Sequence, residues 1–168
     1  MNKLVCAAIL ILLLAGVSQA GELVAKQLFH IERSKNANIV RYDAQLNQSG
    51  VFDRKAPVIA YWVMLAEDGR REGLNLLERT KGYGFRIVPD NPGKSYRMTL
   101  EAYDKRPIKV YAKSQDVKAE MVISGKPAYL EKVYIQSEEG AWWPKVQYIE
   151  LFGTDIATGE KLSEKISP

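Results

Sequence analysis

The sequence contains very few of the side chains that metal centres and thiol chemistry require. It has one histidine, His30, and one cysteine, Cys6, among 168 residues. A structural zinc site takes four ligands, mostly nitrogen and sulfur, and a Ser–His–acid triad would have to use His30. No G-x-S-x-G segment marks a nucleophilic serine. We therefore expect no metal and no cofactor, and we interpret His30 as a structural residue.

Long apolar runs are also scarce. The only one lies at the N-terminus. Residues 4–17 are apolar, a lysine precedes them, and the small residues Ser18 and Ala20 follow. This order is typical of a secretory signal peptide. We expect residues 1–20 to be removed by cleavage after Ala20, together with Cys6, which places the mature chain in the periplasm or outside the cell. Nothing after residue 20 predicts a transmembrane segment.

Neither sign of charge dominates the chain. The formal net charge is +4, and it becomes +3 when the single lysine of the signal peptide is removed. Basic residues concentrate in residues 94–118, and acidic residues concentrate in residues 119–168. Such an asymmetry can steer an anionic partner, although two solvated faces of a sheet give the same pattern. The low net charge and the secretory signal argue against a nucleic-acid partner.

Apolar and polar residues alternate through most of residues 21–168, and this alternation predicts strands. In residues 95–103, Tyr96, Met98 and Leu100 share one face, as in a half-buried strand. Short turn-like connections join the segments and are typical of antiparallel neighbours. The predicted strands cover residues 27–33, 38–42, 57–66, 83–88, 95–103, 107–113, 117–124, 127–136, 145–155 and 160–165. We predict one mainly β domain, an antiparallel meander of about ten strands that forms a barrel or a sandwich.

One segment, residues 68–81, has the spacing of a short helix. Leu74 and Leu77 are three positions apart, and Asp68 or Gly69 can serve as the N-cap. Glycines follow the segment and can end it. We expect this helix to lie across the sheet or to plug an opening in it.

Polar and charged residues gather between residues 30 and 43, at the end of the first predicted hairpin. If Phe29 and Ile31 face the core, alternation places Arg33 at the mouth of a barrel or the rim of a sandwich. Guanidinium groups match the geometry of carboxylate and phosphate groups. The candidate anion-binding rim consists of Arg33, Asn36, Asn38 and Arg41. The alternative is a hairpin tip with its own Arg–Asp pair and turns supported by side chains.

Two adjacent tryptophans, Trp142 and Trp143, lie in a predicted loop beside a proline. Tryptophans in a loop can stack on sugars or line the mouth of a pocket. They can equally cap the core at one end of a barrel. We keep both residues as candidate ligand-binding positions.

Three motifs in the chain resemble a bacterial secreted family of unknown function, domain of unknown function 4833. The motifs are F-x-I-x-R-S-x-N-x-N, Y-W and E-R followed by Y-G. They correspond to Phe29, Ile31, Arg33, Ser34, Asn36, Asn38, Tyr61, Trp62, Glu78, Arg79, Tyr83 and Gly84. The resemblance spans nearly all of residues 21–168 and implies no activity. It adds four candidate ligand-binding residues, Tyr61, Glu78, Arg79 and Tyr83.

These observations favour a non-enzymatic module that binds a small or anionic ligand at the Arg33 end. One alternative is a cell-envelope module that binds another protein through the basic face or an exposed sheet edge. Another is a hydrolase or lyase that uses Glu32, Asp43 or Glu78 together with an arginine. No spacing in the sequence brings two carboxylates together, which counts against this last alternative. The sequence leaves open whether the chain is an enzyme.

Overall fold

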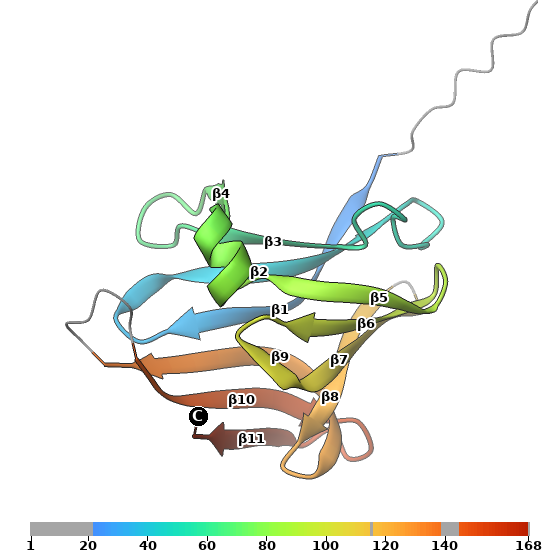
Figure 1. Ribbon diagram of the computed structural model, residues 1–168. Coiled ribbons are helices and arrows are strands. Elements are labelled where there is room, and N and C mark those ends of the chain that lie inside the picture. Colours follow the sequence, from blue (N-terminus) through green and yellow to red (C-terminus); the bar gives the residue numbers. More distant parts are fainter. Residues whose placement is uncertain (1–21, 115, 139–144, 168) are drawn as a thin grey trace, which may run out of the picture.

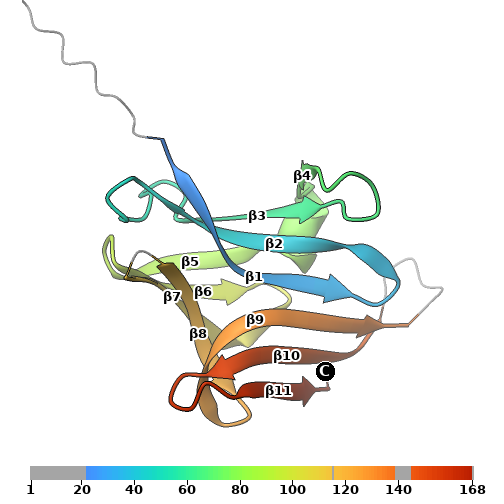
Figure 2. The ribbon, with the colours of Figure 1, turned by 180° about the vertical axis from the view of Figure 1, so that it is seen from behind.

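The computed structural model describes residues 22–114, 116–138 and 145–167. It shows one curled, half-barrel sheet of eleven strands and one short helix (Figures 1 and 2), which confirms the mainly β prediction. The strands are β1 (Val24–Arg33), β2 (Asn36–Leu46), β3 (Val58–Val63), β4 (Arg71–Gly73), β5 (Phe85–Asn91), β6 (Ser95–Leu100), β7 (Tyr103–Lys113), β8 (Asp116–Ile123), β9 (Lys126–Ser137), β10 (Val146–Asp155) and β11 (Lys161–Ile166). The helical element is η1 (Glu78–Gly82). Within these described ranges, no helix has the length and apolar character needed to cross a membrane.

The strand β9 joins the two wings of the sheet. The strand order is β4-β3-β2-β1-β9-β8-β7-β6-β5, with β10 also paired to β9 and β11 paired to β10. The start of β9 pairs with β8, through Glu120 and Tyr129 for example, and its later part pairs with β1, through Ile31 and Val133. Because β10 runs along almost the whole of β9, β8 and β1 share the remaining edge. The sheet therefore divides into a β1–β4 wing and a β5–β8 wing.

The pairing of β1 with β9 is parallel, and every other named pair is antiparallel. The predicted meander is thus correct for the sequential neighbours. The parallel pair joins segments about a hundred residues apart, for example His30 with Lys132. No local turn signal marks such a contact, so periodicity could not reveal it.

The core lies between the two wings and is rich in aromatic rings. Phe29 stacks on Tyr42 with ring centroids 4.5 Å apart, and Tyr42 meets the ring of Phe85 on β5 at 6.0 Å. On the other side, Phe52 packs edge-on against Tyr96 of β6 at 5.2 Å. Both contacts connect one wing to the other, so aromatic packing holds the curl of the sheet.

The helix predicted over residues 68–81 is wrong at its start. Asp68 and Gly69 instead form the turn between β3 and β4, since Asp68 accepts a hydrogen bond from the Arg70 amide and Gly69 has a φ of +75°. The chain becomes helical only after Asn75. Asn75 and Glu78 cap it reciprocally, with each side chain accepting the other's backbone N–H at 3.0 and 2.8 Å. This Asn-x-x-Glu capping box, rather than Asp68, sets the N-terminus of the helix.

The end of η1 is tied closely to the β1–β4 wing, as Figure 1 shows. The buried Tyr42 hydroxyl donates a hydrogen bond to the Tyr83 carbonyl at 2.6 Å. Gly84 lies so close to the helix that a Cβ atom there would overlap the carbonyl oxygen of Arg79. A Cβ atom at Gly82 would meet no atom within 4 Å. The position of η1 therefore depends on a residue without a side chain at 84.

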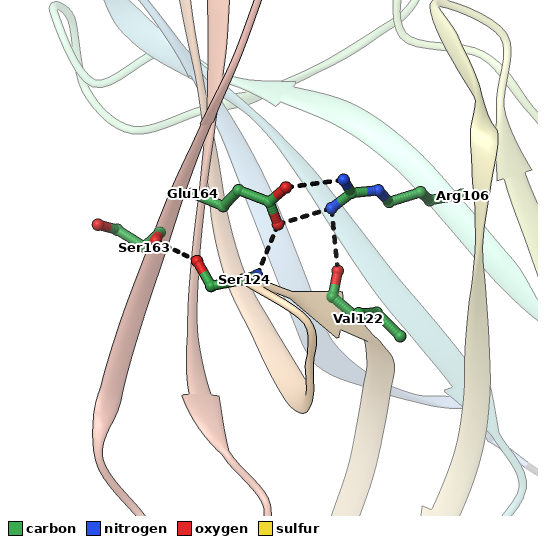
Figure 3. Close-up of polar contacts among 5 residues, drawn as sticks. All are labelled: Arg106, Val122, Ser124, Ser163 and Glu164. Atoms are coloured by element: carbon green, nitrogen blue, oxygen red, sulfur yellow. Dashed lines mark hydrogen bonds and ion pairs between the residues drawn. The ribbon is translucent and has the colours of Figure 1, made fainter.

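A network of polar contacts ties β11 to β7 and β8 (Figure 3). Arg106 of β7 forms two parallel hydrogen bonds of 2.7 Å to the carboxylate of Glu164 on β11 and one of 3.2 Å to the Val122 carbonyl. Glu164 also accepts the Ser124 amide at 2.6 Å, and the Ser124 hydroxyl donates to the Ser163 carbonyl. Hydrogen bonds from the Arg106 guanidinium lower the pKa of Glu164, against the opposing effect of partial burial.

We expect the substitution Gly84→Ala to reduce the free energy of unfolding by about 2 kcal/mol, the usual range for a small-to-large change with no space for the added atom. Urea denaturation followed by circular dichroism measures the change. Gly82→Ala is the matched control, because its Cβ atom has open space. Equal stability of the Gly84→Ala variant and the control would show that the close approach to Arg79 is not required.

We expect the substitution Glu164→Gln to reduce stability at pH 7 by about 2 kcal/mol, because it breaks a charge-assisted pair. The folded pKa of Glu164 is depressed, so its stabilisation is full above the ordinary value of 4.5 and is lost as the pH falls through the folded pKa. The stability difference from the unsubstituted protein should therefore shrink in acid. Parallel stability curves from pH 7 to pH 3 would contradict this, and the exposed Glu160→Gln serves as the control.

Candidate functional site

A cavity of about 390 Å³ lies beside η1, where β1 and β9 end and β2 begins. Its size falls within the range of small-molecule sites. Its walls are formed by Arg33, Asn36, Trp62, Asn75, Leu77, Glu78, Lys81, Gly82, Tyr83, Ala102, Ile135, Ser137 and Val146. Four of the residues proposed from the sequence therefore meet in one place, and they are Arg33, Asn36, Glu78 and Tyr83.

The hairpin between β1 and β2 places Arg33 and Asn36 at the cavity. The two residues pair with each other across a two-residue turn, in which Lys35 has a φ of 62°. Ser34 fixes the turn to β9, because its amide donates to the Ile135 carbonyl at 2.9 Å and its hydroxyl accepts the Ser137 amide at 3.0 Å. The backbone that carries Arg33 is therefore held by β2 on one side and by β9 on the other.

The second wall is the short helix. The Glu78 carboxylate is engaged by the amide of Asn75 and belongs to the helix cap. Within the described parts of the chain, neither the Arg33 guanidinium nor the Lys81 ammonium has a hydrogen bond or an ion pair. The described walls thus carry two cations and one carboxylate, and that carboxylate already has a backbone donor.

The third wall is aromatic. Trp62 of β3 meets the ring of Tyr83 edge-on, with centroids 5.0 Å apart. The hydrogen bond from Tyr42 to the Tyr83 carbonyl holds this wall in place. Trp62 was not among the residues expected to bind a ligand, although it stands in the Y-W motif. Its position follows from the pairing of β3 with β2, where Trp62 lies opposite Val40.

A smaller apolar cleft of about 30 Å³ adjoins the cavity and shares Gly82, Ala102 and Ile135 with it. Its other lining residues are Ile31, Leu100, Tyr103, Arg106, Ile108, Met121, Leu130, Val133, Ile149 and Leu151. Arg106 is the one charged residue among them, and Glu164 neutralises it. The cavity, whose walls carry two cations, therefore adjoins an apolar space inside the half-barrel.

Two predicted residues, Arg41 and Tyr61, do not line this cavity. Arg41 lies on the face of β2 opposite Tyr42, where its Nε bonds Asp43 at 2.7 Å. Tyr61 donates to the same carboxylate at 2.6 Å, and Asp43 is completely buried. Burial and the hydrogen bond to Asp43 raise the pKa of Tyr61 to about 12. For Arg41, the structure matches the alternative of an internal Arg–Asp pair.

The remaining predicted residues lie elsewhere or outside the described chain. The side-chain oxygen of Asn38 accepts the Ala66 amide at 3.1 Å, and Arg79 reaches over Gly73 of β4. Neither of them lines the cavity. Trp142 and Trp143 are outside the residues that the structure describes.

The carboxylates named for a hydrolase or lyase have separate partners. Glu32 accepts from His30 and Lys132, each at 3.1 Å. Asp43 belongs to the pair with Arg41, and only Glu78 lines the cavity. In the described ranges, no group of three or more His, Cys, Asp or Glu side chains is arranged to hold a metal ion.

The chain belongs to the family described as Domain of unknown function (DUF4833), whose model matches residues 29–165. No curated protein matches the chain, and no solved structure does. The family match confirms the predicted family, and a bacterial origin and secretion stay predictions. Because the family description names no activity, the geometry of the cavity carries the argument about function.

The two arginines should respond differently to substitution. We expect Arg41→Ala to lower the free energy of unfolding by about 2 kcal/mol, because it removes the cation beside a fully buried carboxylate. Arg33→Ala should change stability by less than about 0.5 kcal/mol, as is usual for a side chain without such partners. Thermal or urea unfolding of both variants measures the contrast, and the reverse order would contradict the assignment of roles.

Proposed function

We propose that this protein is a non-enzymatic, secreted or periplasmic module that binds a small anionic ligand in the cavity at the Arg33 end. The observation that carries the proposal is the pair of cations, Arg33 and Lys81, on the walls of one cavity with no carboxylate partner within the described chain. An anion placed there would gain charge-assisted hydrogen bonds that the described part of the chain does not supply.

The rest of the lining supports binding rather than catalysis. Asn36, Asn75 and Ser137 offer neutral donors and acceptors, and Trp62 and Tyr83 offer flat apolar surface. The described walls contain no histidine and no cysteine, and their one carboxylate caps the helix. A few polar groups on a mostly apolar concave surface are the usual composition of a ligand pocket.

The proposed location rests on the sequence. Residues 4–17 and the small residues that follow them have the order of a secretory signal peptide. Cleavage after Ala20 would leave the whole of β1 in the mature chain, since that strand begins at Val24.

Native mass spectrometry of the protein purified from its own compartment tests the proposal. We expect a bound mass to be retained by the unsubstituted protein and by Arg54→Ala, and to be lost or reduced about tenfold in Arg33→Ala. Arg54 is exposed, does not line the cavity and gives the same change in charge. A bound mass that persists in Arg33→Ala would contradict the site. A bare protein in every sample, or a co-purified protein chain in place of a small mass, would contradict the proposed function.

A further inference from the structure

Charged and apolar side chains adjoin each other on the cavity walls, since Arg33 of β1 lies opposite Ile135 of β9 and Lys81 precedes Gly82. Arg33 and Lys81 lie among its walls, whereas Ile135 and Val146 contribute hydrocarbon surface. Beyond Ala102 and Ile135, the adjoining cleft is bounded almost entirely by aliphatic side chains. The Arg106 guanidinium in that cleft is satisfied by Glu164 and by the Val122 carbonyl (Figure 3). No uncompensated charge among the described residues thus opposes an apolar group in the inner part.

Apolar surface is also left uncovered on the helical turn beside the cations. Leu76 is 77% exposed and Leu77 is 53% exposed, and Leu77 lines the cavity. Single exposed leucines are normal on protein surfaces. Here the exposed leucine stands one turn from Lys81 on the same wall, so an occupant with a charged end and a hydrocarbon end would satisfy both.

We infer that the ligand is a single-chain amphiphile, with an anionic head group at Arg33 and Lys81 and a hydrocarbon chain directed toward Ala102. This inference rests on the proposed function and adds the chemical class of the ligand. A carboxylate or phosphate head group matches the guanidinium geometry of Arg33. The hydrocarbon chain gains affinity by removing its own surface and that of Leu77, Trp62 and Ile135 from water.

Isothermal titration calorimetry with a homologous series of probes tests the inference. The probes are butanoate, octanoate, dodecanoate and dodecan-1-ol, each below its aggregation limit, and inorganic phosphate. We expect affinity to rise from butanoate to dodecanoate by up to about fourfold for each methylene that becomes buried. Dodecan-1-ol should bind about tenfold more weakly than dodecanoate, because it lacks the charge.

Two variants locate the two ends of the ligand. Arg33→Ala should weaken dodecanoate about tenfold and leave dodecan-1-ol unchanged. Ala102→Leu should remove the advantage of dodecanoate over octanoate and leave butanoate unchanged, because Ala102 is exposed and borders both the cavity and the cleft. Arg54→Ala is the control for charge, and thermal unfolding of each variant checks that it folds.

The outcomes separate this inference from the proposed function. Butanoate or phosphate binding as tightly as dodecanoate, with dependence on Arg33, would overturn the amphiphile and leave the anion site intact. If dodecanoate binds and neither Arg33→Ala nor Ala102→Leu alters its affinity, the ligand binds at another site and the inference is overturned. The absence of binding by every anion, at all chain lengths, would contradict both proposals.

Discussion

The pairing of β9 with three other strands is the constraint on which the rest of the structure depends. Since β10 occupies one edge of β9, the opposite edge must be divided between β8 and β1. The sheet therefore cannot continue as one flat layer, and its two wings curl toward each other (Figure 2). Aromatic contacts between the wings, such as that of Tyr42 with Phe85, then fill the space that the curl creates. A half-barrel follows from one shared strand and the rings packed inside it.

The candidate site is a consequence of the same pairing of β9 with three strands. The end of the β1–β2 hairpin is held against β9 by the contacts of Ser34 with Ile135 and Ser137. That contact fixes Arg33 at the open end of the half-barrel. The helix η1 is fixed opposite it by the Tyr42 hydroxyl and by the absence of a side chain at Gly84. The space between these two fixed elements is part of the cavity, so the fold sets the positions of Arg33 and of the η1 wall.

The face of β1 and β2 that points away from the core has a different character. His30 pairs with Glu32, which also pairs with Lys132, and Arg41 pairs with Asp43. The contact of His30 with Glu32 is a hydrogen bond, and the pairs of Glu32 with Lys132 and of Arg41 with Asp43 join opposite charges. The charges on this face have partners within the chain, whereas Arg33 and Lys81 have none within its described part. The candidate site differs from this face in that its two cations lie together on the walls of one cavity without such partners in the described part of the chain.

Local pattern was sufficient to predict ten of the eleven strands, although β4 lay inside the predicted helix. It also predicted that Arg33 lies at the rim, because alternation from Phe29 and Ile31 sets which side chains point inward. The same alternation around Tyr42 could have assigned Arg41 to the opposite face. The predicted helix starts too early because Asp68 or Gly69 was taken as its N-cap, whereas Asn75 and Glu78 cap it in the structure. The parallel pairing of β1 with β9 and the arrival of Trp62 at the cavity depend on contacts between distant segments, and no local signal carries them.

The most direct test of the account is to map ligand contacts by two-dimensional ¹H–¹⁵N NMR during titration with dodecanoate. The account predicts that shift changes concentrate on the backbone amides of residues that line the cavity, such as Asn36, Gly82 and Ser137. Arg41 and Tyr61, on the opposite face, should hardly move. Changes concentrated on that opposite face, or no changes at saturating probe, would contradict the claim that the open end of the half-barrel is the binding site.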